Sequence, residues 1–223
     1  ESNPPVRAAA GETHSIFIDG EGRLSSCGSA PSYNPGLLGH GEGVTRLNTP
    51  TRLPSPLLGG ERAVSVSAGG VHSLALAADG SVWSWGAGYD GRPGHGDTQN
   101  QLLPKKVEAL AGQRVVAVSA GAHHSLGLTA SGAVWSWGGG GGGKLGHGHT
   151  QPQRPPQEVA ASAGRRVVAV SAGARHSLAL TADGAVWSWG WGGYGKPGHG
   201  DEARQLLPKK VEALADQARR RCV

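Results

Sequence analysis

The sequence contains no methionine, one phenylalanine and only two cysteines. Because even position 1 is not methionine, we expect the chain to be a fragment of a longer protein rather than to begin at a native translation start. Cys27 and Cys222 are too few for the disulfide framework of a small secreted domain or for a paired set of zinc ligands. We therefore expect both thiols to be free and reduced.

Long apolar runs are also missing. None approaches the roughly 18 residues of a membrane span, and residues 1–11 lack the apolar core of a signal peptide. We expect an intracellular protein, cytoplasmic or nuclear, with no membrane contact. Lysine and arginine number 21 against 16 aspartates and glutamates, a net charge of +5, and no charged block is long enough to diagnose nucleic-acid binding. The charge therefore permits contact with a nucleosome or nucleic acid but gives only weak support for it.

Glycine, by contrast, occupies 39 of 223 positions, and the sequence repeats itself. Segments 68–86, 120–138 and 172–190 align without gaps, from an Ala-Gly pair through His-Ser to Trp-Ser-Trp-Gly, and segment 10–28 is a weaker copy. Two histidines mark each copy: His14, His72, His124 and His176 precede serine, and His40, His95, His147 and His199 lie in Gly-His-Gly. The repeat units are 6–63, 64–115, 116–167 and 168–222 within a single domain, 1–223.

Inside each unit the apolar residues alternate, which predicts strands. Val116 and Val118 share one face of a first strand, and Leu126 and Leu128 share one face of a second. Turn dipeptides such as Asp79-Gly80 separate the second and third strands, and a proline-led stretch of the type PKKVEAL predicts a short fourth one. Four strands in about fifty residues indicate one blade of a β-propeller. The fold class is therefore all-β, with a β-solenoid as the alternative.

Each of units two to four carries two tryptophans on one face of its third strand. They are Trp83 and Trp85, Trp135 and Trp137, and Trp187 and Trp189. We expect these large side chains to be buried between neighbouring blades. Unit one has Ser25 and Cys27 instead, so it should pack less well, or against something that the sequence lacks.

We assign no residue to catalysis, cofactor binding or metal binding, because the repeats explain the candidates. Gly138, Gly143 and Lys144 have the spacing of a phosphate-binding loop, but Leu145 follows where that motif needs a hydroxyl, and the pattern recurs at the same place in the next unit. Eight of the ten histidines belong to the two repeating registers, which would spread them around a ring instead of gathering them on one ion. We expect these imidazoles to tie backbone groups between strands.

The units resemble the repeats of the regulator of chromosome condensation family, with the pattern VxxVxxGxxHSLALTxxGxVxxWG followed by LGHG. The resemblance covers nearly all of residues 6–222 and implies a β-propeller that usually has seven blades. Four units then form an open arc of a larger ring, with a closed four-bladed ring as the alternative. If so, the reading frame beyond Val223 should continue close to AVSAG and reach another HSLALT-like strand. The family glutamine before Leu-Gly is Arg92, Lys144 or Lys196 here, so loop contacts with a partner are expected to differ.

Three functions compete. Because propeller loops are presented on a rigid scaffold and nothing catalytic converges, we expect a non-catalytic scaffold for protein–protein interaction, with no cofactor and no small-molecule substrate. The resemblance implies an alternative, guanine-nucleotide exchange on a Ran-like small GTPase with chromatin contact, although no exchange residue can be assigned by motif. Plant UV-B photoreceptors share the repeats, but their GWRHT motif has alanine, Ala174, in place of its tryptophan here. The scaffold is the preferred hypothesis.

Overall fold

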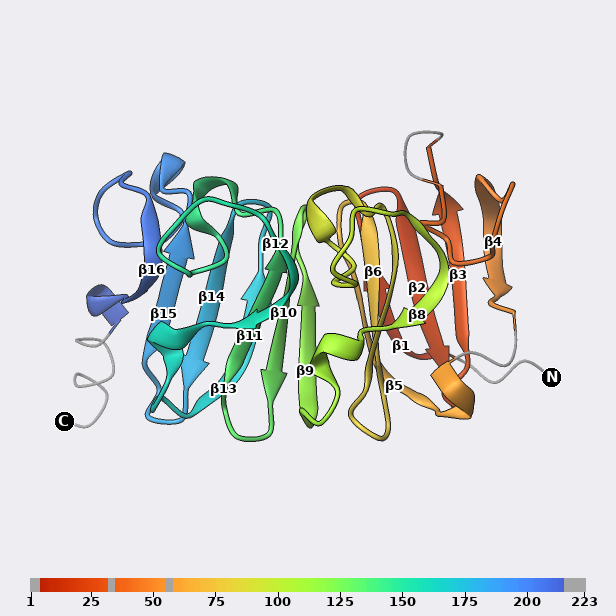
Figure 1. Cartoon of the computed structure of the whole chain (residues 1–223), viewed down its shortest axis with the longest axis horizontal. Helices are drawn as coiled ribbons and strands as arrows, with labels where there is room; N and C mark the ends of the chain where they lie inside the picture. The colour runs from red at the N-terminus through yellow and green to blue at the C-terminus, as the bar shows by residue number, and fades with distance from the viewer. Residues whose placement is uncertain (1–4, 32–34, 55–57, 215–223) are drawn as a thin grey trace.

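The computed structural model describes residues 5–31, 35–54 and 58–214. It contains four antiparallel sheets of four strands each, which we call blades 1 to 4 (Figure 1). Blade 1 consists of β1 (Pro5–Ala10), β2 (His14–Asp19), β3 (Leu24–Ser29) and β4 (Arg46–Arg52), and blade 2 of β5 (Ala63–Ala68), β6 (His72–Ala77), β7 (Val82–Gly86) and β8 (Gln101–Lys106). Blade 3 consists of β9 (Val115–Ala120), β10 (His124–Thr129), β11 (Val134–Gly138) and β12 (Gln153–Glu158), and blade 4 of β13 (Val167–Ala172), β14 (His176–Thr181), β15 (Val186–Gly190) and β16 (Gln205–Lys210). The prediction of an all-β fold made of four-stranded blades is confirmed.

The described residues also contain six short 3-10 turns and, at 212–214, an α-helical turn. Three follow the third strands: η2 (Tyr89–Gly91), η4 (Gly141–Gly143) and η6 (Gly193–Gly195). Three lie between blades: η1 (Leu58–Gly60), η3 (Glu108–Leu110) and η5 (Ala160–Ser162). The fourth strand therefore differs from the prediction, because β8 already begins at Gln101 and the residues after Lys106 turn into η3.

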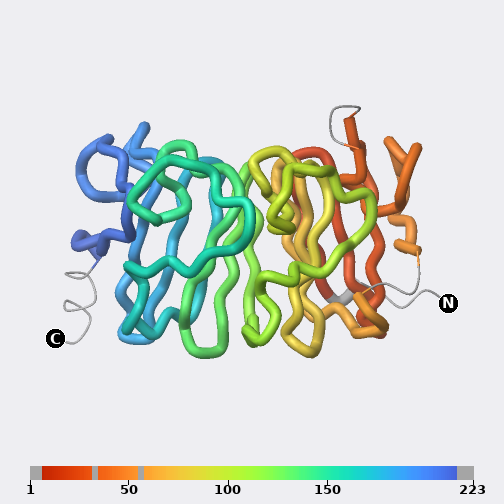
Figure 2. The backbone as a smooth tube through the Cα atoms, in the orientation of Figure 1, coloured from red at the N-terminus to blue at the C-terminus, as the bar shows by residue number. Residues whose placement is uncertain are grey.

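The blades stand side by side in a row that does not close. The innermost strands contact one another in sequence, β1 with β5, β5 with β9 and β9 with β13. Figures 1 and 2 show blade 1 and blade 4 at opposite ends of this row. The open arc expected from the repeat count is therefore what the described residues form.

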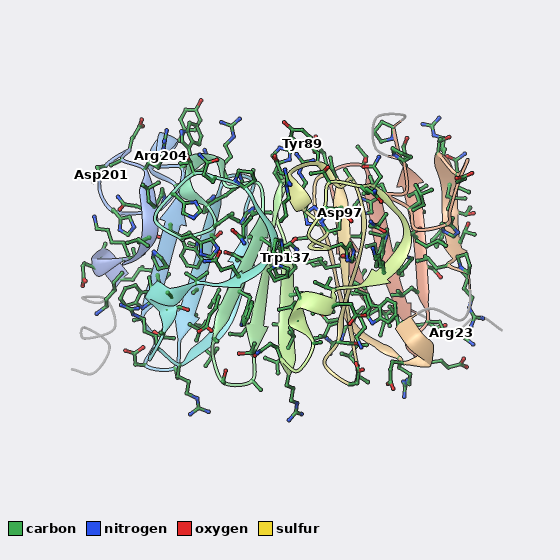
Figure 3. The ribbon with its side chains drawn as sticks, in the orientation of Figure 1. Arg23, Tyr89, Asp97, Trp137, Asp201 and Arg204 are labelled. Atoms are coloured by element: carbon green, nitrogen blue, oxygen red, sulfur yellow. The ribbon has the colours of Figure 1, made fainter. Side chains whose placement is uncertain are left out.

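The strands run between two rims. The loop rim contains the segments between the first and second strands and the long loops after the third strands; in blades 2 to 4 these loops are 87–100, 139–152 and 191–204. The turn rim contains the hairpin turns between the second and third strands and the connections between blades. Figure 3 labels Tyr89 on the loop rim and Arg23 on the turn rim.

The hydrophobic core lies between blades, in three clusters that each draw on two neighbours. Between blades 1 and 2, Ile16 and Ile18 pack with Ala75 and Trp85. Between blades 2 and 3, Leu74 and Leu76 pack with Trp137, and between blades 3 and 4, Leu126 and Leu128 pack with Trp189. Burial of apolar surface therefore stabilises the junctions, and a blade without a neighbour leaves half of such a cluster uncovered.

A β-bulge in each first strand changes one predicted face. In β9 the register to β10 shifts between the pairs Val115–Thr129 and Ala117–Leu128, which leaves Val116 unpaired. Val115 is consequently buried and Val116 is 47% exposed, so the expectation that Val116 shares a face with Val118 is wrong. Alternation of residue types cannot show a bulge, because the strand on either side of it keeps a period of two.

Candidate functional site

The first histidine of each repeat ties its blade to the next blade. His14 Nε2 lies 2.8 Å from Ser73 Oγ, His72 Nε2 2.8 Å from Ser125 Oγ, and His124 Nε2 2.8 Å from Ser177 Oγ. Each serine hydroxyl in turn donates to a carbonyl of the preceding blade's loop rim, at Leu37, Arg92 and Lys144. Since a hydroxyl has one proton and donates it to the carbonyl, we assign the histidine proton to Nε2.

This assignment leaves the other ring nitrogen as a bare acceptor. Nδ1 of His14, His72, His124 and His176 is buried and has no hydrogen-bond partner among the described residues. Burial lowers the pKa of His14 to about 4 and, together with the charges of Arg92, His14 and His123, lowers the pKa of His72 to about 3. These imidazoles are therefore neutral at physiological pH.

The second histidine acts inside its own blade. Nε2 of His40, His95, His147 and His199 lies 2.9–3.1 Å from Oγ of Ser26, Ser84, Ser136 and Ser188, respectively. Each of these serines sits on the third strand and also donates to a carbonyl near the middle of the following loop, as Ser136 does to Leu145 at 2.7 Å. The expectation that both sets of histidines bind backbone groups is wrong. Their Nε2 atoms bind serine hydroxyls, and it is these serines that donate to backbone carbonyls.

The tryptophans of each pair lie at different depths. The second one, Trp85, Trp137 or Trp189, has at most 1% of its surface exposed, whereas the first is half-buried. The second ring reaches the Gly-His-Gly loop of the preceding blade, where a Cβ on Gly94 would come within 2.8 Å of Trp137 Nε1. Trp85 Nε1 donates to Leu37 O at 3.1 Å, while the indole nitrogens of Trp137 and Trp189 have no partner among the described residues. Both members of each pair pack on the preceding blade.

In blade 1, β3 carries Ser25 and Cys27 at the tryptophan positions. Both are half-buried, and Cys27 is a free thiol. Phe17 pairs with Ser25 across the strands, whereas Ala75 pairs with Trp83 and Ala179 with Trp187. The aromatic ring has thus moved from the third strand to the second, so the outer face of blade 1 differs in shape from the inner ones.

The candidate metal ligands and the lysine of the glycine-rich loop have other contacts in the described part of the chain. No three histidine, cysteine, aspartate or glutamate side chains of these residues gather where they could hold a metal ion. His147 and His149 have ring centroids 5.8 Å apart, but His147 is bound to Ser136. In the glycine-rich loop, Lys144 is 5% exposed and donates from Nζ to Gly141 O at 3.0 Å, so it does not point toward a bound phosphate.

Sequence reasoning named the histidines and tryptophans but missed the serines that hold them. The signal was present, since a serine follows every first-register histidine and precedes every second tryptophan of units two to four. What the sequence cannot show is that the partner of His72 lies 53 residues away in the next blade.

Comparison with known proteins decides the family. The model of the RCC1-like domain matches residues 1–223. The chain belongs to this family. Human E3 ubiquitin-protein ligase HERC2 is 39% identical over 213 residues, which are 94% of this chain and 4% of that protein. The ultraviolet-B receptor UVR8 of Arabidopsis thaliana is 39% identical over 210 residues, 94% of this chain and 46% of the receptor.

Solved structures give the same fold. Human WBSCR16 superposes with a TM-score of 0.81 at 25% identity over 92% of this RCC1-like chain, and Prp20p of Saccharomyces cerevisiae with 0.82 at 23% identity over 97%. This chain covers 51% and 52% of those two structures, so it spans about half of their length, and it spans a much smaller share of a long relative such as HERC2. No helix among the described residues is long and apolar enough to cross a membrane.

Proposed function

We propose that this RCC1-like segment is a non-catalytic scaffold that binds a protein partner through its loop rim. The observation that carries the proposal is which side chains form structural contacts within and between blades and which remain exposed on the loop rim. The first-register histidines, their serine partners and the tryptophans of the Trp-Ser-Trp pairs form the blade junctions, and the second-register histidines bind serines of their own blade. The loop rim, in contrast, exposes the aromatic side chains of Tyr89 and Tyr194. Tyr89, in η2, is 68% exposed although blades lie on both sides of it. Exposed aromatic residues on a rigid loop are typical of protein interfaces.

The proposal includes an intracellular location, cytoplasmic or nuclear, because a free Cys27 suits a reducing compartment. It assigns no enzyme activity to this segment. Nucleotide exchange on a small GTPase is not preferred, because no observation on the loop rim favours a GTPase over another protein.

A selection from a random peptide display library tests the proposal. The purified chain should enrich peptides that bind it reversibly and remain unmodified on prolonged incubation, and a variant with Tyr89→Ser should lose most of them. The matched control is Arg114→Glu on the turn rim, where Arg114 is exposed; it should leave the selected peptides unchanged. Enrichment of no peptide, or equal loss with Arg114→Glu, would contradict the proposal.

A further inference from the structure

A continuous set of aromatic and cationic side chains crosses the loop rim from blade 2 to blade 4. We call it the rim belt; its members are Tyr89, Arg92, Lys144, Arg175, Trp191, Tyr194 and Lys196, whose Nζ lies 4.4 Å from the ring centroids of both Trp191 and Tyr194. None of these side chains takes part in the histidine–serine junctions.

The blade 2 end of the belt is built around Arg92. Its guanidinium carbon lies 5.2 Å from the centroid of the Tyr89 ring, and its Nη2 lies 3.8 Å from Asp90 Oδ2. Arg92 is only 9% exposed, and its Nε is buried without a hydrogen-bond partner among the described residues. A buried cation with one distant carboxylate is incompletely neutralised.

Lys144 adds a second buried cation in blade 3. Burial lowers the pKa of Lys144 to about 8, the carboxylate of Asp90 opposes this shift, and the charges of Arg92 and Arg175 add to it. Arg92 and Lys144 therefore share Asp90 as their acidic neighbour. One carboxylate offsets only part of the charge of two cations, so the belt carries excess positive charge.

The blade 4 end is an aromatic corner. Trp191 and Tyr194 meet edge to face with centroids 5.7 Å apart, and the Arg175 guanidinium lies 5.1 Å from the Trp191 ring centroid. Trp191 packs against Gly142 of blade 3, where a Cβ would come within 2.9 Å of Trp191 Cβ and where φ is +82°. Gly142 must therefore be glycine for the corner to form.

Between the two ends, part of the blade 3 loop consists of glycine and has no side chains. Residues 138–143 are six consecutive glycines, and Gly141 is exposed. Tyr194, 84% exposed, and Asp90 next to Tyr89 have φ of +63° and +59°, so both aromatic ends stand on tightly constrained turns. Rigid tyrosines that border accessible main chain can bind an extended peptide at low entropic cost.

We propose that the rim belt binds an extended acidic segment of a partner protein. The inference rests on the proposed function and names the surface and the partner chemistry. Exposed Arg175 is placed to form ion pairs with the segment, while buried Arg92 and Lys144 attract it through a region of low dielectric. Tyr89, Trp191 and Tyr194 supply aromatic contact of the kind that dominates interface energies.

A protein segment fits better than nucleic acid. A phosphate backbone needs a row of exposed lysines and arginines, whereas Arg92 and Lys144, two of the belt's four cations, are buried and the two exposed ones lie together at the blade 4 end. Asp90 also lies within the belt, and Asp97 and Asp201 flank it on the same loops (Figure 3). A peptide can place its acidic side chains at intervals that avoid these carboxylates.

Fluorescence anisotropy with defined probes tests the inference. A labelled peptide of alternating aspartate and serine should bind the whole chain at low salt, and binding should weaken at least tenfold between 50 and 500 mM NaCl. Arg175→Glu should weaken it about tenfold or more, and Tyr89→Ser, at the other end of the belt, several-fold. The matched charge reversal Arg114→Glu on the turn rim should leave the affinity unchanged. Thermal melting of each variant separates lost binding from lost folding.

Three results would overturn the inference. They are equal binding of an asparagine–serine peptide, unchanged binding by Arg175→Glu, and tighter binding of oligothymidylate than of the acidic peptide. If the display selection enriches neutral or basic peptides that still need Tyr89, the acidic partner is wrong and the scaffold function stands. If the selection enriches nothing, the proposed function itself fails.

Discussion

His72 Nε2 and Ser125 Oγ, 53 residues apart in sequence, lie 2.8 Å apart at the junction of blades 2 and 3. His72→Ala should destabilise the chain by about 2–3 kcal/mol, because it empties a buried site and leaves Ser125 Oγ without its donor. Urea denaturation measures the change. His149→Ala is the matched control, because His149 is exposed and lies outside both registers; a cost equal to that of His72→Ala would contradict the junction role.

Lowering the pH should destabilise the folded chain through the buried histidines of the blade junctions. The pKa of His14 is lowered to about 4 and that of His72 to about 3, both mainly by burial, against 6.5 for a free imidazole. The unfolded chain therefore takes up protons below pH 6.5 while the folded chain does not, so stability is full above pH 6.5 and falls as pH drops from 6.5 toward 4. Each buried histidine contributes up to about 1.4 kcal/mol per pH unit in that window.

Thermal melts across pH 4 to 8 check this dependence. The melting temperature should be flat above pH 7 and fall steeply below pH 6, and His72→Gln, which cannot take up a proton, should flatten the slope. A melting temperature that rises on acidification would contradict the assignment of neutral histidines.

The indole nitrogens distinguish two otherwise equivalent tryptophans. Trp85 Nε1 donates to Leu37 O at 3.1 Å, but Trp137 Nε1 has no partner among the described residues. Trp85→Phe should therefore cost about 1 kcal/mol more than Trp137→Phe, since both changes remove similar volume and only one removes a hydrogen bond. Chemical denaturation measures the free energy of unfolding of both variants. An equal loss, or a larger loss for Trp137→Phe, would contradict the prediction.

Gly86 and Gly96 both have positive φ, but only at Gly86 would an added Cβ meet a close steric contact. Gly86 has φ +107°, and a Cβ there would lie 2.7 Å from Val71 O, whereas Gly96 has φ +84° and nothing within 4 Å. Gly96→Ala should cost about 1 kcal/mol, and Gly86→Ala roughly 2–4 kcal/mol, because β6 and β7 approach each other there. Similar melting temperatures for the two variants would show that the close approach at Gly86 is not a constraint.

The sequence was sufficient for the blade count, the strand order within a blade and the placement of tryptophans against neighbouring blades, because two histidine registers and a period of two repeat together. It was insufficient where structure depends on partners from another repeat. The serine that binds His72 could not be chosen from sequence spacing alone. The bulge that exposes Val116 leaves the residue pattern intact, and the start of β8 ahead of Pro104 follows from pairing with β7 rather than from local propensity.

The contacts within the rim belt could not be predicted from the sequence either, because they also join residues of different repeats. The replacement of the family glutamine by Arg92 and Lys144 was visible in the sequence, but their burial and their shared neighbour Asp90 were not. Trp191 follows the last Trp-Ser-Trp-Gly in the sequence, but its contact with Gly142 depends on how blades 3 and 4 are joined.

The open end of blade 4 gives the most direct test of the account, which holds that apolar surface is buried at blade junctions. Leu180 and Leu214 are 38% and 42% exposed there, although the equivalent Leu76 and Leu110 are buried by blade 3. Light scattering of the purified chain, with thermal melting alongside, should give a mass above the 22.6 kDa of one chain, and Leu180→Glu should lower it toward that value. A monodisperse 22.6 kDa particle with one cooperative transition, unchanged by Leu180→Glu, would contradict the open row of blades.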